Sequence, residues 1–254
     1  MSLQTQVSYI GKGEVFIQKR GTAGAKMVPI GNCSALQFGI AEEKKELKDY
    51  TRTGGGLLDS VTTIQSVTAS MSVSNLSPEN LALATRGTTS AVASATVTDE
   101  AHADILLGSL IRLAKVPDVT ATVTVKKGAT VIASAGNWEI NGAGLWIAAV
   151  PAADLLANDE ITVSYTALAG DVVQALTTSN EEYTLIFSGL NEARSGKPVI
   201  VAVHRLKFSP AASLDWIADD FGQLEMSADV LADATVTGSG LSKYLKIEMA
   251  SQSA

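Results

Sequence analysis

A regular alternation of apolar and hydroxyl side chains through residues 66–74 restricts this segment to a β-strand. A period of two places one set of side chains on a core and the other set in water. The wet side of this strand is long and carries no charge. The apolar set is Val67, Ala69, Met71 and Val73, and the polar set is Ser66, Thr68, Ser70, Ser72 and Ser74.

The segment before this strand has the opposite character. The chain has 19 Lys and Arg and 26 Asp and Glu, together 45 charged residues, and residues 41–60 hold nine of them. Three successive glycines, Gly54, Gly55 and Gly56, follow most of these charges. We expect a mobile charged arm joined by a glycine hinge to the strand. It is either a disordered, solvated loop or an arm that becomes ordered on a partner.

Shorter patterns indicate that the rest of the chain is mainly β. Ser77, Pro78 and Glu79 form a helix start, with a capping hydroxyl, a proline and an early acid, and Gly87 ends this short helix. Strand patterns recur on both sides of it. They lie at residues 15–17, 36–40, 183–188, 199–208, 224–230 and 243–249.

The middle of the chain resembles a small antiparallel unit. Turn signals such as Lys126-Lys127-Gly128 separate its short strands. Trp138, Trp146 and Tyr165 would anchor its core. The predicted division is residues 1–98 for the first part of a main β core, 99–114 for a linker, 115–168 for an inserted β module, and 169–254 for the second part of the core.

Composition excludes several functional classes. The net charge of −7 and pI near 4.9 argue against binding phosphates through clustered Lys and Arg. Cys33 is the only cysteine, which excludes an internal disulfide and cysteine-based metal sites. There is no secretory signal pattern and no apolar run approaching the ~20 residues of a membrane span. We therefore expect a soluble chain made in the cytosol.

Residues for catalysis are scarce. The chain has only two histidines, His102 and His204, and no Gly-x-Ser-x-Gly motif. Phosphate-loop and dinucleotide fingerprints are also missing. Asp99, Glu100 and Asp104 lie around His102, but no second His or Cys group is near in sequence, so a solvated turn is favoured over a metal site. We expect no enzymatic activity, no metal and no cofactor.

Long half-polar strands leave sheet edges that a closed ring of subunits would remove. A characteristic order of hydrophobic runs and turns is found at residues 11–17, 28–36, 42–47, 66–73, 78–84, 183–207 and 221–232. In this order the chain resembles the major tail tube proteins of long-tailed, siphophage-like bacteriophages. The resemblance covers roughly residues 5–90 and 180–250.

The resemblance implies a β-sandwich or barrel-forming tail-tube fold with one short helix. The inserted, immunoglobulin-like β module departs from the shortest members of the family, and we expect it on the outside of the tube. Subunits would form hexameric rings that stack into the tube through which the viral genome enters the host. The implied partners are further copies of the chain and the tape-measure, tail-terminator and distal tail proteins. DNA would pass without specific binding, and no membrane is involved. The implied location is the virion tail, assembled in the host cytoplasm.

Two sets of site residues follow from the resemblance. The family's ring-to-ring loop corresponds here to residues 42–59. Its candidate contacts are Glu42, Glu43, Lys44, Lys45, Glu46, Leu47, Lys48, Asp49, Tyr50, Arg52, Leu57, Leu58 and Asp59. The candidate lumen-facing polar strand consists of Ser66, Thr68, Ser70, Ser72 and Ser74.

Two other classes remain open. A virion decoration or adhesin-like binding protein would share the β content and the immunoglobulin-like module, but would not need the charged arm. A carbohydrate-active enzyme would need clustered aromatic residues and paired acids, and only 5% of the residues here are aromatic.

Overall fold

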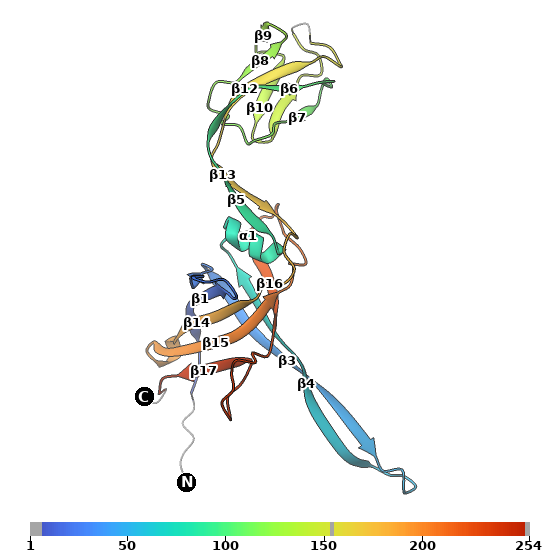
Figure 1. The fold of residues 1–254 in the computed structure, drawn as a ribbon, viewed down its shortest axis with the longest axis vertical. Helices are drawn as coiled ribbons and strands as arrows, with labels where there is room; N and C mark the ends of the chain where they lie inside the picture. Colours follow the sequence, from blue (N-terminus) through green and yellow to red (C-terminus); the bar gives the residue numbers. More distant parts are fainter. Residues whose placement is uncertain (1–6, 153–154, 252–254) are drawn as a thin grey trace. The chain divides into compact units, whose positions relative to one another are not determined.

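Antiparallel strands account for most of the secondary structure, so the mainly β prediction is confirmed (Figure 1). The computed structural model describes residues 7–152 and 155–251. The chain divides into two units, one formed by Met1–Thr89 with Val173–Ala254 and the other by Ser90–Val172.

The first unit is built on one eight-stranded sheet. Its strand order is β2-β1-β14-β15-β16-β4-β3, and β17 pairs with β15 beside β16. The strands are β1 (Gly11–Lys19), β2 (Val28–Pro29), β3 (Cys33–Lys48), β4 (Leu57–Val73), β14 (Tyr183–Asn191), β15 (Lys197–Phe208), β16 (Leu224–Val230) and β17 (Leu245–Met249), and the 3-10 helix η1 (Glu192–Arg194) follows β14.

A single apolar core lies against this sheet. Val15, Met71, Leu185, Leu206 and Met226 come from five different strands and are all buried in one cluster. Because three strands separate β1 from β4 in the sheet order and both contribute to this cluster, we infer that the sheet curves around it. Burying each such side chain contributes roughly 1.5–3 kcal/mol.

The short helix α1 (Pro78–Thr85) closes one end of the first unit, as the sequence predicts. The Ser77 side chain accepts a hydrogen bond from the Asn80 backbone N–H at 3.2 Å. The helix ends at Arg86, whose backbone is left-handed with φ 49°, and Gly87 N–H donates to Ala82 O at 2.7 Å. No helix among the described residues is long and apolar enough to cross a membrane.

Asp233, which follows β16, links to the segment that follows β1. Its carboxylate accepts hydrogen bonds from the backbone N–H and hydroxyl of Thr235 and lies 2.8 Å from Arg20 Nη1. These hydrogen bonds, with the Arg20 charge, lower the pKa of Asp233 to about 2. Arg20 also donates to the His204 carbonyl at 2.5 Å, so the pair joins the segment after β1 to the strands around β15.

The substitution Asp233→Asn should make the melting temperature of the chain less sensitive to pH below about 4. An unfolded carboxyl group titrates near pH 3.9. The stabilisation from ionised Asp233 is therefore present above about pH 4 and is lost as the pH falls towards 2. The difference in melting temperature between the wild type and the variant should shrink over that range, which thermal unfolding at pH 5, 4, 3 and 2.5 measures. A constant difference would contradict this role.

The second unit has a core of its own, to which two sheets contribute. One sheet has the order β6-β12-β8-β9 and the other β10-β11-β7. Their strands are β6 (Ala95–His102), β7 (Leu110–Arg112), β8 (Thr124–Lys127), β9 (Thr130–Ile132), β10 (Trp138–Asn141), β11 (Gly144–Ile147) and β12 (Ile161–Ala167). The strands β5 (Thr88–Val92) and β13 (Gly170–Gln174) pair with each other.

Two details of the second unit differ from the sequence-based expectations. Residues 99–114, expected as a linker, include part of β6 and all of β7, so they belong to its sheets. Trp138 and Tyr165 are buried as predicted, but Trp146 is 44% exposed. Leu145 and Ile147 occupy the core face of β11, and the alternation of the strand turns Trp146 outward.

Candidate assembly surface

The charged arm is a β-ribbon. β3 and β4 pair from Cys33 and Val73 to Lys48 and Leu57, whereas β16 pairs with β4 only at residues 68–73 (Figure 1). At about 3.3 Å per residue, the part of β4 from Leu57 to Val67 extends roughly 30 Å with β3 as its only paired strand. At the base of this part, Ile64 and Val67 line a pocket with Tyr244 and Leu245. The expected mobile loop is therefore wrong, because main-chain hydrogen bonds between the two strands order the segment.

The three glycines form the end of the ribbon and are not a hinge before a strand. Asp49 N–H donates to Gly56 O at 2.8 Å, which closes the turn. A Cβ at Gly55 would lie 1.9 Å from Asp49 O, so this position requires glycine. Thr51 donates to Asp49 Oδ1 from its hydroxyl and its backbone N–H, and these bonds lower the pKa of Asp49. The tip is a defined turn.

The charges of β3 pair largely with one another. Lys44 Nζ lies 2.8 Å from Glu46 Oε1, and Lys45 Nζ lies 3.9 Å from Glu43 Oε1. Successive residues of a strand point to opposite faces, so each face of the ribbon carries one of these pairs. All four side chains are about half exposed or more, and such pairs contribute roughly 0–1 kcal/mol each.

The ribbon also exposes large apolar side chains, mostly on the β4 side. Of the predicted contact residues, Tyr50 is 84% exposed and Leu58 is 62% exposed. Isolated exposed apolar residues are normal, but a row along an unsupported ribbon is typical of an interaction surface. The residues of this apolar row are Leu47, Tyr50, Leu57, Leu58, Val61 and Ile64. Within β4, Leu57 and Val61 lie on one face of the ribbon and Leu58 and Ile64 on the other. Val61 and Ile64 were not among the predicted contacts, and the order Val-Thr-Thr-Ile has no period of two that would single them out.

The hydroxyl-rich face of β4 extends onto β16. Val67, Ala69, Met71 and Val73 are buried, as the alternation predicts, while the intervening side chains are exposed or half-buried. Ser74 lies beyond the last residue of β4, so its predicted place on this strand is wrong. The pairs across the two strands are Thr68 with Asp229, Ser70 with Ser227, and Ser72 with Glu225.

Two carboxylates therefore lie in line with the serine row. Glu225 accepts a hydrogen bond from the Ser72 hydroxyl at 2.8 Å, and both Glu225 and Asp229 are exposed. Within residues 7–152 and 155–251, neither forms an ion pair. Lys207 is opposite Asp229 on β15, but its ammonium donates to Asn180 Oδ1. This face is polar, and its two carboxylates are uncompensated.

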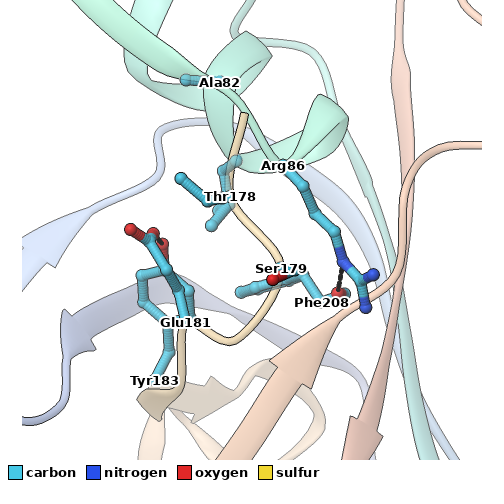
Figure 2. A pocket seen from close by; sticks show the side chains of 8 residues that line it. Ala82, Arg86, Thr178, Ser179, Glu181, Tyr183 and Phe208 are labelled. Atoms are coloured by element: carbon cyan, nitrogen blue, oxygen red, sulfur yellow. Dashed lines mark hydrogen bonds between the residues drawn. The ribbon is translucent and has the colours of Figure 1, made fainter. Parts of the chain in front are cut away.

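A small pocket beside α1 has no room for a substrate (Figure 2). Its volume is about 10 Å³, close to the minimum for one water molecule. Arg86 Nε donates to Phe208 O at 2.6 Å, and Glu181 accepts hydrogen bonds from Lys19 and Tyr183. Burial opposes ionisation of Glu181, but these two bonds outweigh it and lower its pKa. The charged groups of Arg86 and Glu181 and the Tyr183 hydroxyl are thus used within the fold.

The acidic residues near His102 serve the second unit's sheet. Asp99 accepts hydrogen bonds from Lys126 and Ser164, and Glu100 accepts one from the buried Tyr165 hydroxyl at 2.7 Å. Among the residues with described positions, no three His, Cys, Asp or Glu side chains gather as they would around a metal ion. These acids act as partners for neighbouring strands.

A second exposed apolar surface was not singled out from the sequence. It lies between β15 and β16, where Trp216 is 71%, Ile217 98% and Phe221 90% exposed. The sequence does contain a signal for this surface. The three bulky apolar residues lie among Asp215, Asp219 and Asp220, in a segment without the alternation of a strand.

Fold and surface thus define a mainly β chain whose most exposed features are a long ribbon and an apolar loop. A family model described as "Protein of unknown function UCP028589" matches residues 8–248. Since this match covers most of the 254 residues, the chain belongs to that family. A search of curated proteins found no match.

Proposed function

We propose that this chain is a structural virion protein that assembles into stacked rings, hexameric by resemblance, and forms a phage tail tube for genome delivery. The observation that carries the proposal is the β3–β4 ribbon. It is paired along its length, it projects from the sheet, and the outer members of its apolar row, from Leu47 to Val61, are between 52% and 84% exposed. A partner that covers it would bury the row, and a neighbouring ring would be such a partner.

Open strand edges also support assembly. β3 is the last strand in the sheet order, so its outer edge of 16 residues is unpaired among the described residues. A long unpaired edge invites pairing with another chain, and a closed ring removes it. Ring closure would thus use the edge of the sheet, while stacking would use the ribbon.

The polar face of β4 and β16 suits the wall of a DNA conduit. It carries hydroxyl groups and the two carboxylates of Glu225 and Asp229. DNA binds proteins mainly through cationic contacts to phosphate, and a wall of opposite character repels it. In the proposed tube this face lines the lumen, and DNA slides past without specific binding.

Electron microscopy of the purified chain tests the proposal directly. Rings or tubes of uniform diameter should form as the protein concentration increases. Monodisperse monomers at high concentration, established by light scattering on the same sample, would contradict it.

A virion decoration or adhesin-like binding protein is the second candidate. The second unit favours it, because this unit has its own core and two sheets of four and three strands. An immunoglobulin-like sandwich has the same number of strands and often carries binding loops at its ends. This candidate leaves the ribbon without a role, so we place it second.

A further inference from the structure

The exposed loop between β15 and β16 combines bulky apolar side chains with acids. We name residues 215–221 the acidic loop. The segment that carries it is fixed to the first unit, because Ala211 N–H donates to Ala84 O at 2.7 Å and Leu214 packs against the core. Its three carboxylates form no ion pair with any residue whose position is described. The loop thus presents apolar groups and negative charge on a fixed base.

The tip of the ribbon has complementary groups. Lys48 and Arg52 are exposed, and neither forms an ion pair within the described residues. Tyr50 and Leu47 supply exposed apolar surface beside them. Asp49, the acid of this turn, is engaged by Thr51. The tip therefore offers two unpaired cations and an aromatic ring.

These two surfaces lie at opposite ends of β4. The ribbon tip precedes Leu57, the first residue of the strand. The segment with the acidic loop leads into Leu224, which pairs with Val73 at the other end. A strand of 17 residues spans roughly 50 Å at about 3.3 Å per residue, so the tip and the loop of one chain are far apart. Figure 1 shows the ribbon leaving the sheet at the end of β4 away from α1.

We propose that the ribbon tip of one copy binds the acidic loop of the next copy. Two different surfaces at opposite ends make a head-to-tail contact, and such a contact can repeat from copy to copy along a stack. Aromatic groups surrounded by polar residues commonly carry most of the energy of such an interface, and opposite charges fix its orientation. This inference rests on the proposed assembly and names the surface that receives the ribbon.

Cysteine cross-linking between two full-length variants tests the contact. One carries Thr53→Cys at the tip and the other Ala218→Cys in the loop, both with Cys33→Ser so that no other thiol competes. Both positions are exposed, and the charged and bulky apolar residues of the proposed contact remain in place. Mixed under mild oxidation, with a tag on one variant, the two should give mainly a disulfide-linked pair of one copy of each. Pairs of two Thr53→Cys chains as the main product would overturn the proposal.

A charge exchange adds a second measurement. Lys48→Glu with Arg52→Glu in the tip variant should lower the mixed cross-link several-fold, and Asp219→Lys with Asp220→Lys in the loop variant should restore it. Failure of both effects would also overturn the contact. Rings or tubes in the microscope without a mixed cross-link would overturn this contact alone. A mixed cross-link from chains that form no rings would contradict the proposed tube and support the head-to-tail contact.

Discussion

Cutting the ribbon back to its base should leave a folded chain that no longer forms tubes. Glu43 and Thr63 are directly opposed in the β3–β4 pair, so residues 44–62 can be replaced by Asn-Gly, which closes a hairpin with a two-residue turn. None of the removed residues is buried, and none belongs to the core. Single rings or smaller species should remain, because the stacking contact is lost while the sheet is intact.

The structure sharpens the design of this variant. Deleting only Lys44 to Gly55 would remove the outer part of β3 and leave Leu57 to Thr62 unpaired, and an unpaired strand edge promotes aggregation. The symmetric cut avoids this. Thermal unfolding of the shortened chain should match the wild type within a few degrees, and electron microscopy should show no elongation. Tubes of normal length from this variant would refute a role of the ribbon in stacking.

Local sequence patterns correctly predicted the strand and the helix that pack against the core. The alternation at 67–73 matches the buried face of β4, and the cap at Ser77 starts α1 as expected. The outer half of β3 could not be recognised this way, because its side chains touch no core and carry no period of two. Main-chain hydrogen bonds to β4 order it, and these are invisible in the residue types.

The glycines of the tip illustrate the same limit. Three glycines in a row suggest mobility, yet Gly55 is required by the close approach of Asp49 O. That approach depends on the pairing of two strands, which a local reading does not provide. The acidic loop was missed for another reason, since exposed Trp216 and Ile217 contradict the expectation that such residues are buried. Sites that bind other chains break this rule most often.

Apolar residues of the ribbon should matter more for stacking than its ion pairs. Full burial of a leucine is worth roughly 1.5–3 kcal/mol. Leu57 is 53% and Leu58 is 62% exposed, so covering both should contribute roughly 2–3 kcal/mol per contact. Leu57→Ser with Leu58→Ser should therefore raise the protein concentration needed for elongation by about 30- to 150-fold per contact.

The matched control neutralises an ion pair on the same ribbon. Lys44→Gln with Glu46→Gln removes a pair that is about half exposed, where the expected contribution is roughly 0–1 kcal/mol, so the required concentration should rise by less than about fivefold per contact. Sedimentation of assembled material at graded concentrations compares the two variants with the wild type. A larger effect from the charge variant than from the leucine variant would show that electrostatics dominates the contact. The leucine variant should have the larger effect if the ribbon binds its neighbour through the apolar row and its charges only orient the contact.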